Sequence, residues 1–247
     1  MAPPKQRLDQ LLVTRKLAPS RERARTLIRE GSVLVGGLPA TKPGTMVADA
    51  SSVTLKAADF PYVSRGGLKL EKALATFAID PQGAVCLDVG ASTGGFTDCL
   101  LQHGAAKVYA VDVGYGQLAW KLRQDPRVVV IERTNARNIS ADEIPEKADL
   151  VTIDVSFISL RLIVPAVLPL MKPSAGLVAL IKPQFEVGKG QVGKGGVVKD
   201  GRLHEEVLAS LEAFFNTLPL IHRGHVPSPI LGPKGNKEFL VYLLRRS

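Results

Sequence analysis

The feature that most constrains the fold is the alternation of short apolar runs with helical patterns after the first quarter of the chain. The apolar runs predict strands at 85–89, 107–112, 128–132, 149–154, 176–181 and 237–244. Helical periodicity predicts helices at 68–78, 96–104, 116–124, 161–171 and 202–217. Strands of this kind are buried on both faces, so the pattern predicts an α/β fold with a parallel, Rossmann-like sheet covered by helices on both sides.

A glycine-rich turn follows the first predicted strand and points to a ligand. The turn begins at Asp88 and carries Gly90, Gly94 and Gly95. Glycines between a strand and a helix let a ligand approach the backbone at the carboxyl edge of the sheet. Their spacing differs from the GxGxxG fingerprint of dinucleotide-binding enzymes. A carboxylate at position 88 would also repel a pyrophosphate, whereas it could attract the sulfonium cation of S-adenosylmethionine (SAM).

Asp112 closes the second predicted strand, where its carboxylate can accept hydrogen bonds from the ribose hydroxyls of a nucleoside. A dehydrogenase could use the same aspartate, but no Tyr-x-x-x-Lys pair lies where a short-chain dehydrogenase needs one. The two aspartates and the glycine spacing therefore predict SAM as the cofactor. The alternative is a glycine turn with a purely structural role.

The residues after the fourth predicted strand indicate which atom receives the methyl group. Residues 154–157 read Asp-Val-Ser-Phe, not the Asn/Asp-Pro-Pro-Tyr with which amino-methylating enzymes hold an exocyclic nitrogen. Cys86 and Cys99 lack the Pro-Cys context of enzymes that attack a cytosine carbon covalently. The acceptor is therefore predicted to be an oxygen.

A ribose 2′-hydroxyl is a poor nucleophile at neutral pH, so the site must remove or orient its proton. A lysine amine can do this once a neighbouring ammonium and partial burial lower its pKa from about 10.4. The candidates at strand ends, or on segments that can reach them, are Lys69, Asp154, Lys182 and Glu238. Lys182 closes an apolar strand, which favours a functional role. Lys69 and Glu238, taken alone, are more often surface charges.

The positive charge of the chain is concentrated at its amino end. Of the formal net charge of +9, residues 1–66 contribute +6, from 11 Lys and Arg against 5 Asp and Glu. Arg21, Arg25 and Arg29 recur at every fourth position of a predicted helix and form a cationic stripe. This distribution predicts a polyanion-binding module, with a solvated helix face as the alternative.

That module is predicted to be compact. Helical patterns cover 7–16 and 21–30, and strand patterns follow at 32–35 and 52–55.

The sequence has no run of about eighteen apolar residues that would predict a membrane span. Charges also interrupt every hydrophobic run near the start, unlike in a signal peptide. We therefore expect a cytoplasmic protein whose two cysteines are buried, reduced thiols.

The amino-terminal pattern resembles the RNA-binding domain named after ribosomal protein S-four. It reads Arg-Leu-Asp-x-Leu-Leu from residue 7, then Ser-Arg-x-x-Ala-x-x-Leu-Ile-x-x-Gly-x-Val-x-Val from residue 20. The resemblance covers 7–56 and implies that the basic helix grips RNA phosphates more than it reads bases.

The whole chain is similar to the TlyA family, in which an S-four-type head precedes an FtsJ-like body. Its four candidate residues match, in order and context, the Lys-Asp-Lys-Glu tetrad of FtsJ-like RNA ribose 2′-O-methyltransferases. Segments 88–97, 112–118, 132–137 and 182–196 carry the same resemblance. It implies an S-four-type domain at 1–59, a linker at 60–67 and a SAM-dependent methyltransferase domain at 68–247. It further implies methyl transfer from SAM to the 2′-hydroxyl of a cytidine in ribosomal RNA.

The resemblance also assigns residues to roles. Lys182 is implied as the general base and Asp154 as the group that orients it and the methyl group, while Lys69 and Glu238 position the ribose. The residues expected to bind SAM are Asp88, Gly90, Ser92, Gly94, Gly95, Phe96, Asp112, Val113 and Asn135. The residues expected to contact RNA are Arg7, Arg21, Arg25, Arg29, Lys42, Arg65, Arg133, Arg137 and Lys189. Phe157 is expected either to stack on a displaced base or to pack in the core.

We expect ribosomal RNA and ribosomal subunits as partners, and no metal, membrane or obligate protein partner. The sequence ends soon after the last predicted strand, whereas family members that modify both subunits continue with a further helix. This favours a large-subunit cytidine. Two other classes are considered: a non-catalytic RNA-binding or ribosome-assembly factor, and a membrane-active protein, because some family members were described as haemolysins. The membrane-active class is disfavoured because the sequence has no apolar span and no amphipathic membrane face.

Overall fold

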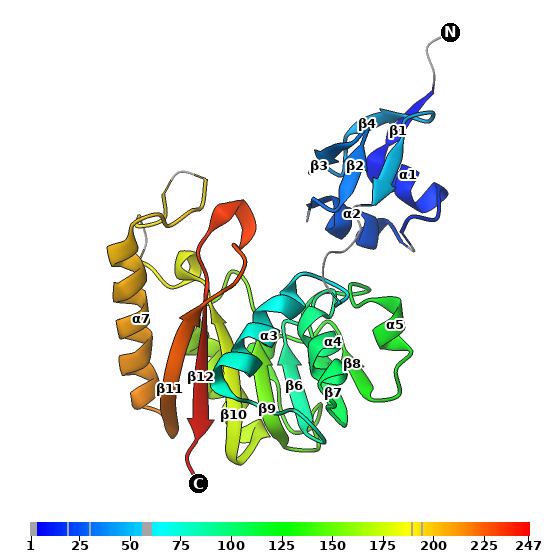
Figure 1. Ribbon diagram of the computed structural model, residues 1–247. Helices are drawn as coiled ribbons and strands as arrows, with labels where there is room; N and C mark the ends of the chain where they lie inside the picture. Colours follow the sequence, from blue (N-terminus) through cyan, green and yellow to red (C-terminus); the bar gives the residue numbers. More distant parts are fainter. Residues whose placement is uncertain (1–3, 19, 30, 56–60, 189, 194) are drawn as a thin grey trace. The chain divides into compact units, whose positions relative to one another are not determined.

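A computed structural model describes residues 4–18, 20–29, 31–55, 61–188, 190–193 and 195–247 (Figure 1). The chain divides into two compact units, Met1–Pro61 and Tyr62–Ser247. Each unit is described by itself below. The domain boundaries expected from the sequence stay a prediction.

Within its described residues, the amino-terminal unit combines two short helices with five three-residue strands. Its elements are β1 (Lys5–Arg7), α1 (Leu8–Thr14), α2 (Arg21–Arg29), β2 (Val33–Val35), β3 (Leu38–Ala40), β4 (Met46–Ala48) and β5 (Val53–Leu55). β1 pairs with β4, and β2 lies between β3 and β5; all these pairs are antiparallel. Both predicted helices and the two predicted strands are present. The sequence did not predict β1, β3 and β4, because three residues carry too little periodicity.

A small apolar core holds this unit together. Side chains three or four positions apart on the two helices meet the inward side of the strands. The buried members are Leu8, Leu11, Leu12, Ala18, Ala24, Ile28, Val33, Val47 and Val53. The Ser20 hydroxyl accepts a hydrogen bond from the Arg23 amide at 3.1 Å and so caps the start of α2.

The second unit alternates strands and helices, as predicted. Its elements are α3 (Gly66–Phe77), β6 (Val85–Val89), α4 (Gly95–Gln102), β7 (Lys107–Val111), α5 (Trp120–Arg123), β8 (Val128–Ile131), β9 (Ala148–Ile153), α6 (Leu160–Val167), β10 (Met171–Ile181), α7 (Gly201–Asn216), β11 (Leu220–Pro227) and β12 (Phe239–Arg245). The predicted strands and helices are all found, with ends that shift by a few residues. The main shifts are a later start of α5 and an earlier start of β10.

The strands of this unit form one seven-stranded sheet in the order β11-β12-β10-β9-β6-β7-β8. The five strands from β10 to β8 are parallel, as predicted. The sheet is not parallel throughout, because β12 pairs antiparallel with both β10 and β11. β11 was not predicted at all. Every second residue of this edge strand is exposed, and its histidines and arginine give it no apolar run.

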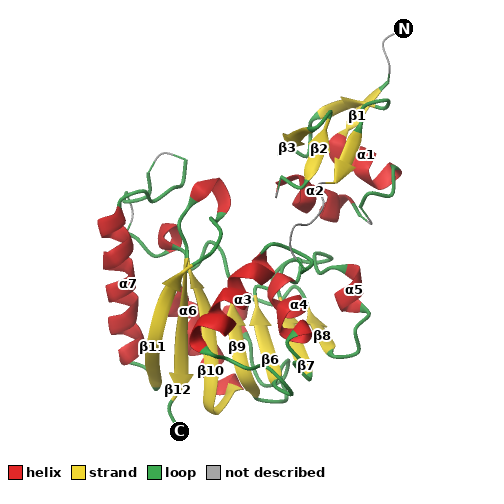
Figure 2. Cartoon of the chain, viewed as in Figure 1, coloured by secondary structure: helices red, strands yellow, loops and turns green. Residues whose placement is uncertain are grey.

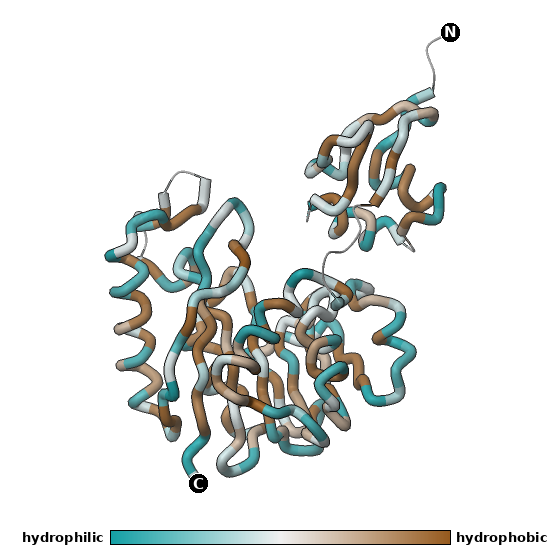
Figure 3. The backbone as a smooth tube through the Cα atoms, in the orientation of Figure 1, coloured by the Kyte–Doolittle hydropathy of each residue, from teal (hydrophilic) through white to brown (hydrophobic). Residues whose placement is uncertain are grey.

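Helices cover both faces of the sheet. Figure 2 shows α3 and α4 in front of the strands, and α6 behind them. Alternate strand residues such as Leu87, Val151 and Leu177 share a buried cluster with Ile163 of α6 and Phe215 of α7. Figure 3 shows apolar segments concentrated along the central strands. The helices therefore bury both sides of the sheet and leave its carboxyl edge for the site.

The predicted linker ends inside this unit. Tyr62 is buried, and its hydroxyl donates to Glu71 of α3 at 2.8 Å. The Val63 amide donates to the carboxylate of Asp98 in α4 at 2.7 Å. α3 begins at Gly66 rather than at residue 68. The segment just before α3 is thus packed against α3 and α4.

Candidate active site

Parallel strands and one antiparallel strand bring charged residues to one edge of the sheet. Ala179 of β10 pairs with Ile153 of β9, and Ile181 of β10 pairs with Phe239 of β12. Because β12 runs the other way, its amino end lies beside the carboxyl ends of β9 and β10. The residues that flank these pairs are Asp154, Lys182 and Glu238.

Lys69, in the first turn of α3, completes the group. Its Nζ lies 2.7 Å from Glu238 Oε2 and 4.0 Å from Asp154 Oδ2. Lys182 Nζ lies 2.6 Å from Asp154 Oδ1 and donates to Ser156 Oγ at 2.8 Å. The side chains thus alternate in charge, from Lys182 to Asp154 to Lys69 to Glu238. The structure brings together all four predicted residues, which we call the tetrad.

The tetrad is largely shielded from solvent. Lys69, Lys182 and Glu238 are buried, and only the Asp154 side chain is about one fifth exposed, at 22%. Burial on its own would raise the pKa of Asp154, but the charges of Lys182 and Lys69 outweigh it and hold that pKa below its ordinary value. Asp154 is therefore an ionised carboxylate between two amines.

Three buried acceptor oxygens at this edge make no hydrogen bond among the described residues. One of them, Asp154 Oδ1, has Lys182 Nζ as an ion-pair partner at 2.6 Å, and the other two are Glu238 Oε1 and Gln184 Oε1. A Cβ added to Gly232 would lie 2.0 Å from Glu238 Oε1, so the carboxylate rests directly against a glycine backbone. A buried acceptor without a donor is costly. The site therefore suits a ligand that brings hydroxyl groups.

A cavity of about 430 Å³ lies next to Asp154. This volume lies in the range of roughly 300–1,000 Å³ that is typical of cofactor pockets. Five of the residues predicted to bind SAM line it: Gly90, Ser92, Asp112, Val113 and Asn135. The other lining residues are Val111, Gln117, Thr134, Ala136, Asp154, Val155, Ser156, Phe157, Ile158 and Ile163. Most of these were missed, although they follow the ends of neighbouring strands, which was the signal that could have found them.

The lining of the cavity fits SAM. Apolar side chains such as Val113 and Ile158 can enclose an adenine ring, and the Asp112 carboxylate can accept from ribose hydroxyls. Asp112 is fixed for this purpose, because it accepts from the Ser92 amide at 2.8 Å and the Gly114 amide at 2.7 Å. A carboxylate can accept further hydrogen bonds beside these two.

Gly90 is the glycine on which the cavity depends. It follows β6 with a φ of +86°, a conformation that favours glycine. A Cβ at this position would lie 2.5 Å from the carbonyl oxygen of Asp154. The absence of a side chain therefore lets the end of β6 approach the end of β9, where the cavity meets the tetrad.

Four residues predicted to bind SAM lie outside the cavity lining: Asp88, Gly94, Gly95 and Phe96. Asp88 is fully buried, and its carboxylate accepts from Thr97 Oγ1 at 2.6 Å and from Thr152 Oγ1 at 2.9 Å. It is thus held inside the fold rather than offered to a sulfonium. Phe96 is also buried, in α4.

Gly94 and Gly95 allow close packing around the turn. A Cβ on Gly94 would lie 2.2 Å from Leu122 Cδ1 of α5, and a Cβ on Gly95 would lie 2.4 Å from Ser64 Oγ. The predicted turn is present, and these two glycines let neighbouring segments approach it closely. Their contact with SAM stays a prediction.

Phe157 lies at the cavity with its ring in solvent. It is 90% exposed, and its φ of +65° is unusual for a bulky residue. The ring centroid lies 5.0 Å from that of Phe185. The expectation that it packs in the core is therefore wrong.

Predicted RNA-contacting residues of this unit lie near the same edge. Arg133 and Arg137 are exposed, and Arg65 is half-buried just before α3. The Arg133 guanidinium lies 4.2 Å from the centre of the Tyr115 ring, so it is held over an exposed aromatic. Lys189 lies outside the described residues.

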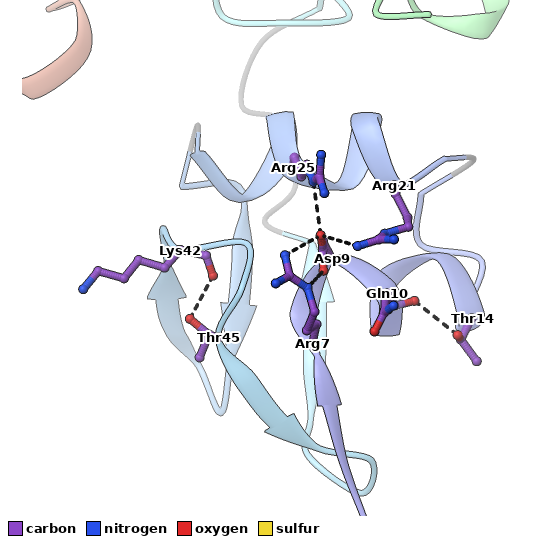
Figure 4. A network of polar contacts seen from close by, with 8 residues as sticks. All are labelled: Arg7, Asp9, Gln10, Thr14, Arg21, Arg25, Lys42 and Thr45. Carbon is purple, nitrogen blue, oxygen red and sulfur yellow. Dashed lines mark hydrogen bonds and ion pairs between the residues drawn. The ribbon is translucent and has the colours of Figure 1, made fainter.

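The predicted cationic stripe of α2 is partly neutralised within the amino-terminal unit. Arg21 and Arg25 both contact Asp9, and so does Arg7 of β1 (Figure 4). Arg29 is exposed at the end of α2, and Lys42 is exposed in the turn before β4. The stripe is therefore part of an ion-pair cluster rather than a plain solvated face.

A mostly parallel sheet with a cofactor-sized cavity and a buried row of alternating charges at its carboxyl edge defines a SAM-dependent methyltransferase. The model of the FtsJ-like methyltransferases matches residues 62–245, and the model of the S4 domain matches residues 6–51. The chain belongs to the TlyA family of FtsJ-like methyltransferases, in which an S4 domain precedes the catalytic domain.

Three relatives illustrate the match. A 16S/23S rRNA (cytidine-2′-O)-methyltransferase TlyA of Mycobacterium tuberculosis is 50% identical over 96% of this chain and 89% of its own length. A putative rRNA methyltransferase of Bacillus subtilis is 50% identical over 98% of this chain and 87% of its own. A solved structure described as a putative hemolysin from Streptococcus thermophilus is 44% identical, with a TM-score of 0.78, and covers 100% of this chain and 90% of its own.

The first prediction concerns Gly90. We expect Gly90→Ala to weaken SAM binding at least about tenfold, because the new Cβ would push the ends of β6 and β9 apart. Gly83→Ala is the matched control: Gly83 also has a positive φ, +71°, but a Cβ there meets nothing within 4 Å. Calorimetric titration with SAM measures both variants. Equal affinities in the two variants would contradict the role given to Gly90.

The second prediction concerns Asp88. Burial raises its pKa to about 6 despite the hydrogen bonds from Thr97 and Thr152, whereas the unfolded value is about 3.9. Between these two values the folded state binds more protons, so this group makes the protein less stable as pH rises from about 4 to about 6. At pH 8 Asp88 is ionised, and the full loss of stability caused by its burial is present. Asp88→Asn should then increase the free energy of unfolding by on the order of 2–3 kcal/mol.

The measurement is urea unfolding of the wild type and the variant across this pH range. The difference in the free energy of unfolding between Asp88→Asn and the wild type should grow from pH 4 to pH 6 and then stay constant. The exposed Asp142→Asn provides the control for removal of one negative charge. A difference for Asp88→Asn that does not change with pH would refute the argument.

Proposed function

We propose that this protein transfers a methyl group from SAM to the 2′-hydroxyl of a cytidine ribose in ribosomal RNA. The observation that carries the proposal is the buried tetrad, in which Asp154 belongs both to the charge chain and to the lining of the cofactor cavity. The name of the mycobacterial relative supports the nucleotide and the atom.

The residues of the tetrad have different roles in methyl transfer. SAM supplies a methyl group made electrophilic by its sulfonium. Lys182 Nζ, held by Ser156 Oγ at 2.8 Å, acts as the base in its neutral amine form, after it has given its own proton to solvent. It then accepts the proton of the 2′-hydroxyl as the oxygen takes the methyl group, and S-adenosylhomocysteine would leave. Asp154 fixes the Lys182 amine from the other side. Glu238, with one oxygen on Lys69 and the other without a donor among the described residues, positions the ribose by accepting from a hydroxyl group.

Side chains around the cavity suit a nucleotide that has left its stack. Phe157 offers a bare ring next to Asp154, and every base has a face that can stack on an aromatic ring. Arg65, Arg133 and Arg137 then contact phosphates near the site, and the head supplies further contacts with the RNA. We assign the head to 1–59, the linker to 60–67 and the catalytic domain to 68–247, and place the enzyme in the cytoplasm with its ribosomal substrate.

The other two classes have less support. A non-catalytic RNA-binding factor would not need four charged groups buried at a cofactor cavity, which are costly unless they serve a purpose. The haemolysin name occurs among the structural relatives. Within the described part of the chain, no helix has the length and apolar character required to cross a membrane.

The third prediction tests the tetrad. Lys182→Ala should lower methyl transfer from labelled SAM to ribosomal RNA by roughly 10²–10⁴-fold, because general-base catalysis is abolished. Lys182 is not part of the cavity lining, so calorimetry should show SAM binding within a few-fold of the wild type. Lys172→Ala is the control, since Lys172 lies near the other end of β10 and pairs with Asp149 at the surface.

Asp154→Ala should abolish transfer in the same way, because it removes the carboxylate between the two amines. Full transfer by both tetrad variants would overturn the assigned mechanism. Absence of transfer by the wild type, together with tight RNA binding, would instead favour the non-catalytic factor.

The fourth prediction concerns the ribosomal subunit. We propose a large-subunit cytidine. The name of the mycobacterial relative gives both 16S and 23S rRNA, whereas that of a relative from Campylobacter jejuni, 37% identical over 74% of this chain, gives 23S rRNA alone. Purified large and small subunits, incubated separately with enzyme and labelled SAM, should show incorporation mainly in the large subunit. Comparable incorporation in both would show dual specificity, and incorporation only in the small subunit would refute the proposal.

A further inference from the structure

The amino-terminal unit contains a buried carboxylate that the reaction itself does not use. Asp9 lies in the first turn of α1 and is fully buried, although its neighbours Leu8, Leu11 and Leu12 form the apolar core. A carboxylate is almost never fully buried unless it is paired, because the cost of removing its hydration is large. Asp9 must therefore be understood through its partners.

Three arginines from two elements surround this carboxylate (Figure 4). Arg7 of β1 grips both oxygens, with Nε 2.9 Å from Oδ1 and Nη2 3.0 Å from Oδ2. Arg21 Nη2 and Arg25 Nε, from successive turns of α2, donate to Oδ2 at 3.3 and 3.2 Å. The hydrogen bonds from the arginines, that from Arg7 above all, hold the pKa of Asp9 well below its ordinary value.

The arginines are anchored on one side and open on the other. Their side chains are 40%, 48% and 44% exposed, whereas that of Asp9 is 0% exposed. The four hydrogen bonds to Asp9 use a minority of the five N–H donors that each guanidinium carries. Three positive charges around one negative charge leave a net +2 at the surface. This group, Asp9 with its three arginines, is called the Asp9 cluster.

The surrounding backbone fixes the cluster further. The Asp9 amide donates to the carbonyl of Pro43, and a Cβ added to Gly44 would lie 3.3 Å from Arg7 Nη1. The turn before β4 therefore lies against the Arg7 guanidinium, and it carries the exposed Lys42. Figure 4 shows the Lys42 side chain directed away from Asp9. The cluster and Lys42 form separate cationic points on one unit.

We propose that Asp9 is a positioning residue that holds Arg7, Arg21 and Arg25 together as one binding site for backbone phosphates of folded RNA. Without a central anion, three guanidinium groups so close together would repel one another and take up many rotamers. With it, the N–H donors that face solvent are fixed in advance, and preorganised donors bind with a smaller entropy cost. This inference rests on the proposed function, which supplies the RNA.

We expect Asp9→Asn to lower the affinity for RNA, whereas a count of charges alone would predict a higher affinity. The variant removes one negative charge from the head, so nonspecific electrostatics alone would strengthen binding to a polyanion. Weaker positioning of the arginines should instead reduce the affinity roughly tenfold. It should also make the dependence of log K on log salt shallower, by roughly 0.7 for each phosphate that the arginines no longer bind. Asp49→Asn is the matched control: it makes the same charge change at an exposed carboxylate of the same unit, outside the cluster.

The experiment uses the full chain and a fluorescently labelled transcript of large-subunit ribosomal RNA. Affinity is measured by anisotropy at several potassium chloride concentrations for the wild type, Asp9→Asn and Asp49→Asn. Circular dichroism melting reports whether the head stays folded. In a double-mutant cycle, Asp9→Asn should have a much smaller effect once Arg25→Gln is present, because Asp9 acts through the arginines.

A second variant keeps the test decisive if Asp9→Asn unfolds the head. Arg7→Lys preserves every charge but removes the two-point hydrogen bonding to Asp9, so it should weaken binding several-fold and flatten the salt dependence. Affinity and salt slope equal to the wild type in that variant would overturn the inference, as would Asp9→Asn behaving like Asp49→Asn. If the wild type binds and methylates RNA in those cases, only the role of Asp9 fails. If the wild type does neither, the proposed function fails with it.

Discussion

The ion pair between Lys69 and Glu238 is the contact on which the rest of the site depends. It joins the first helix of the catalytic unit to the start of its last strand, 169 positions apart in the sequence. Neither charge could be buried alone, because an unpaired ion inside a protein costs several kcal/mol. Asp154 and Lys182 extend the pair into a neutral row of four. The fold thus gathers these four charges at a cofactor cavity, each beside a charge of opposite sign.

Both units hold a carboxylate between cationic side chains, but the two arrangements suit different functions. In the catalytic unit a carboxylate lies between two amines and beside a cavity, so the charges are shielded and directed inward. In the amino-terminal unit Asp9 is buried under three arginines whose other sides face solvent. The first arrangement suits proton transfer on a bound ribose, and the second suits contact with a polyanion. The exposure of the cations is what separates them.

The sequence located the cofactor edge, but it did not show which way each side chain at that edge points. Gly90 and Asp112 line the cavity as expected, because residues directly after parallel strands must lie at one edge. Asp88 lies inside β6, and its side chain points toward Thr97 of α4 and Thr152 of β9, which satisfy it. The position of a carboxylate beside a glycine turn in the sequence does not show which way its side chain points. The alternation of the strand decides whether it faces a ligand or the core.

The four tetrad residues were singled out by their match to the pattern of the FtsJ-like family. The amino-acid sequence by itself determined the local features of this protein: the strand and helix order, the glycine turn and the basic head. These depend on periodicity and turn chemistry within about ten residues. Tertiary structure alone decided that β12 returns antiparallel beside β10, which sets Glu238 next to Lys69. It also decided that Arg21 and Arg25 turn toward Asp9. Both outcomes depend on contacts between segments that are distant in the sequence. These contacts form only in the folded chain, through the pairing of strands and the burial of charged groups beside their partners.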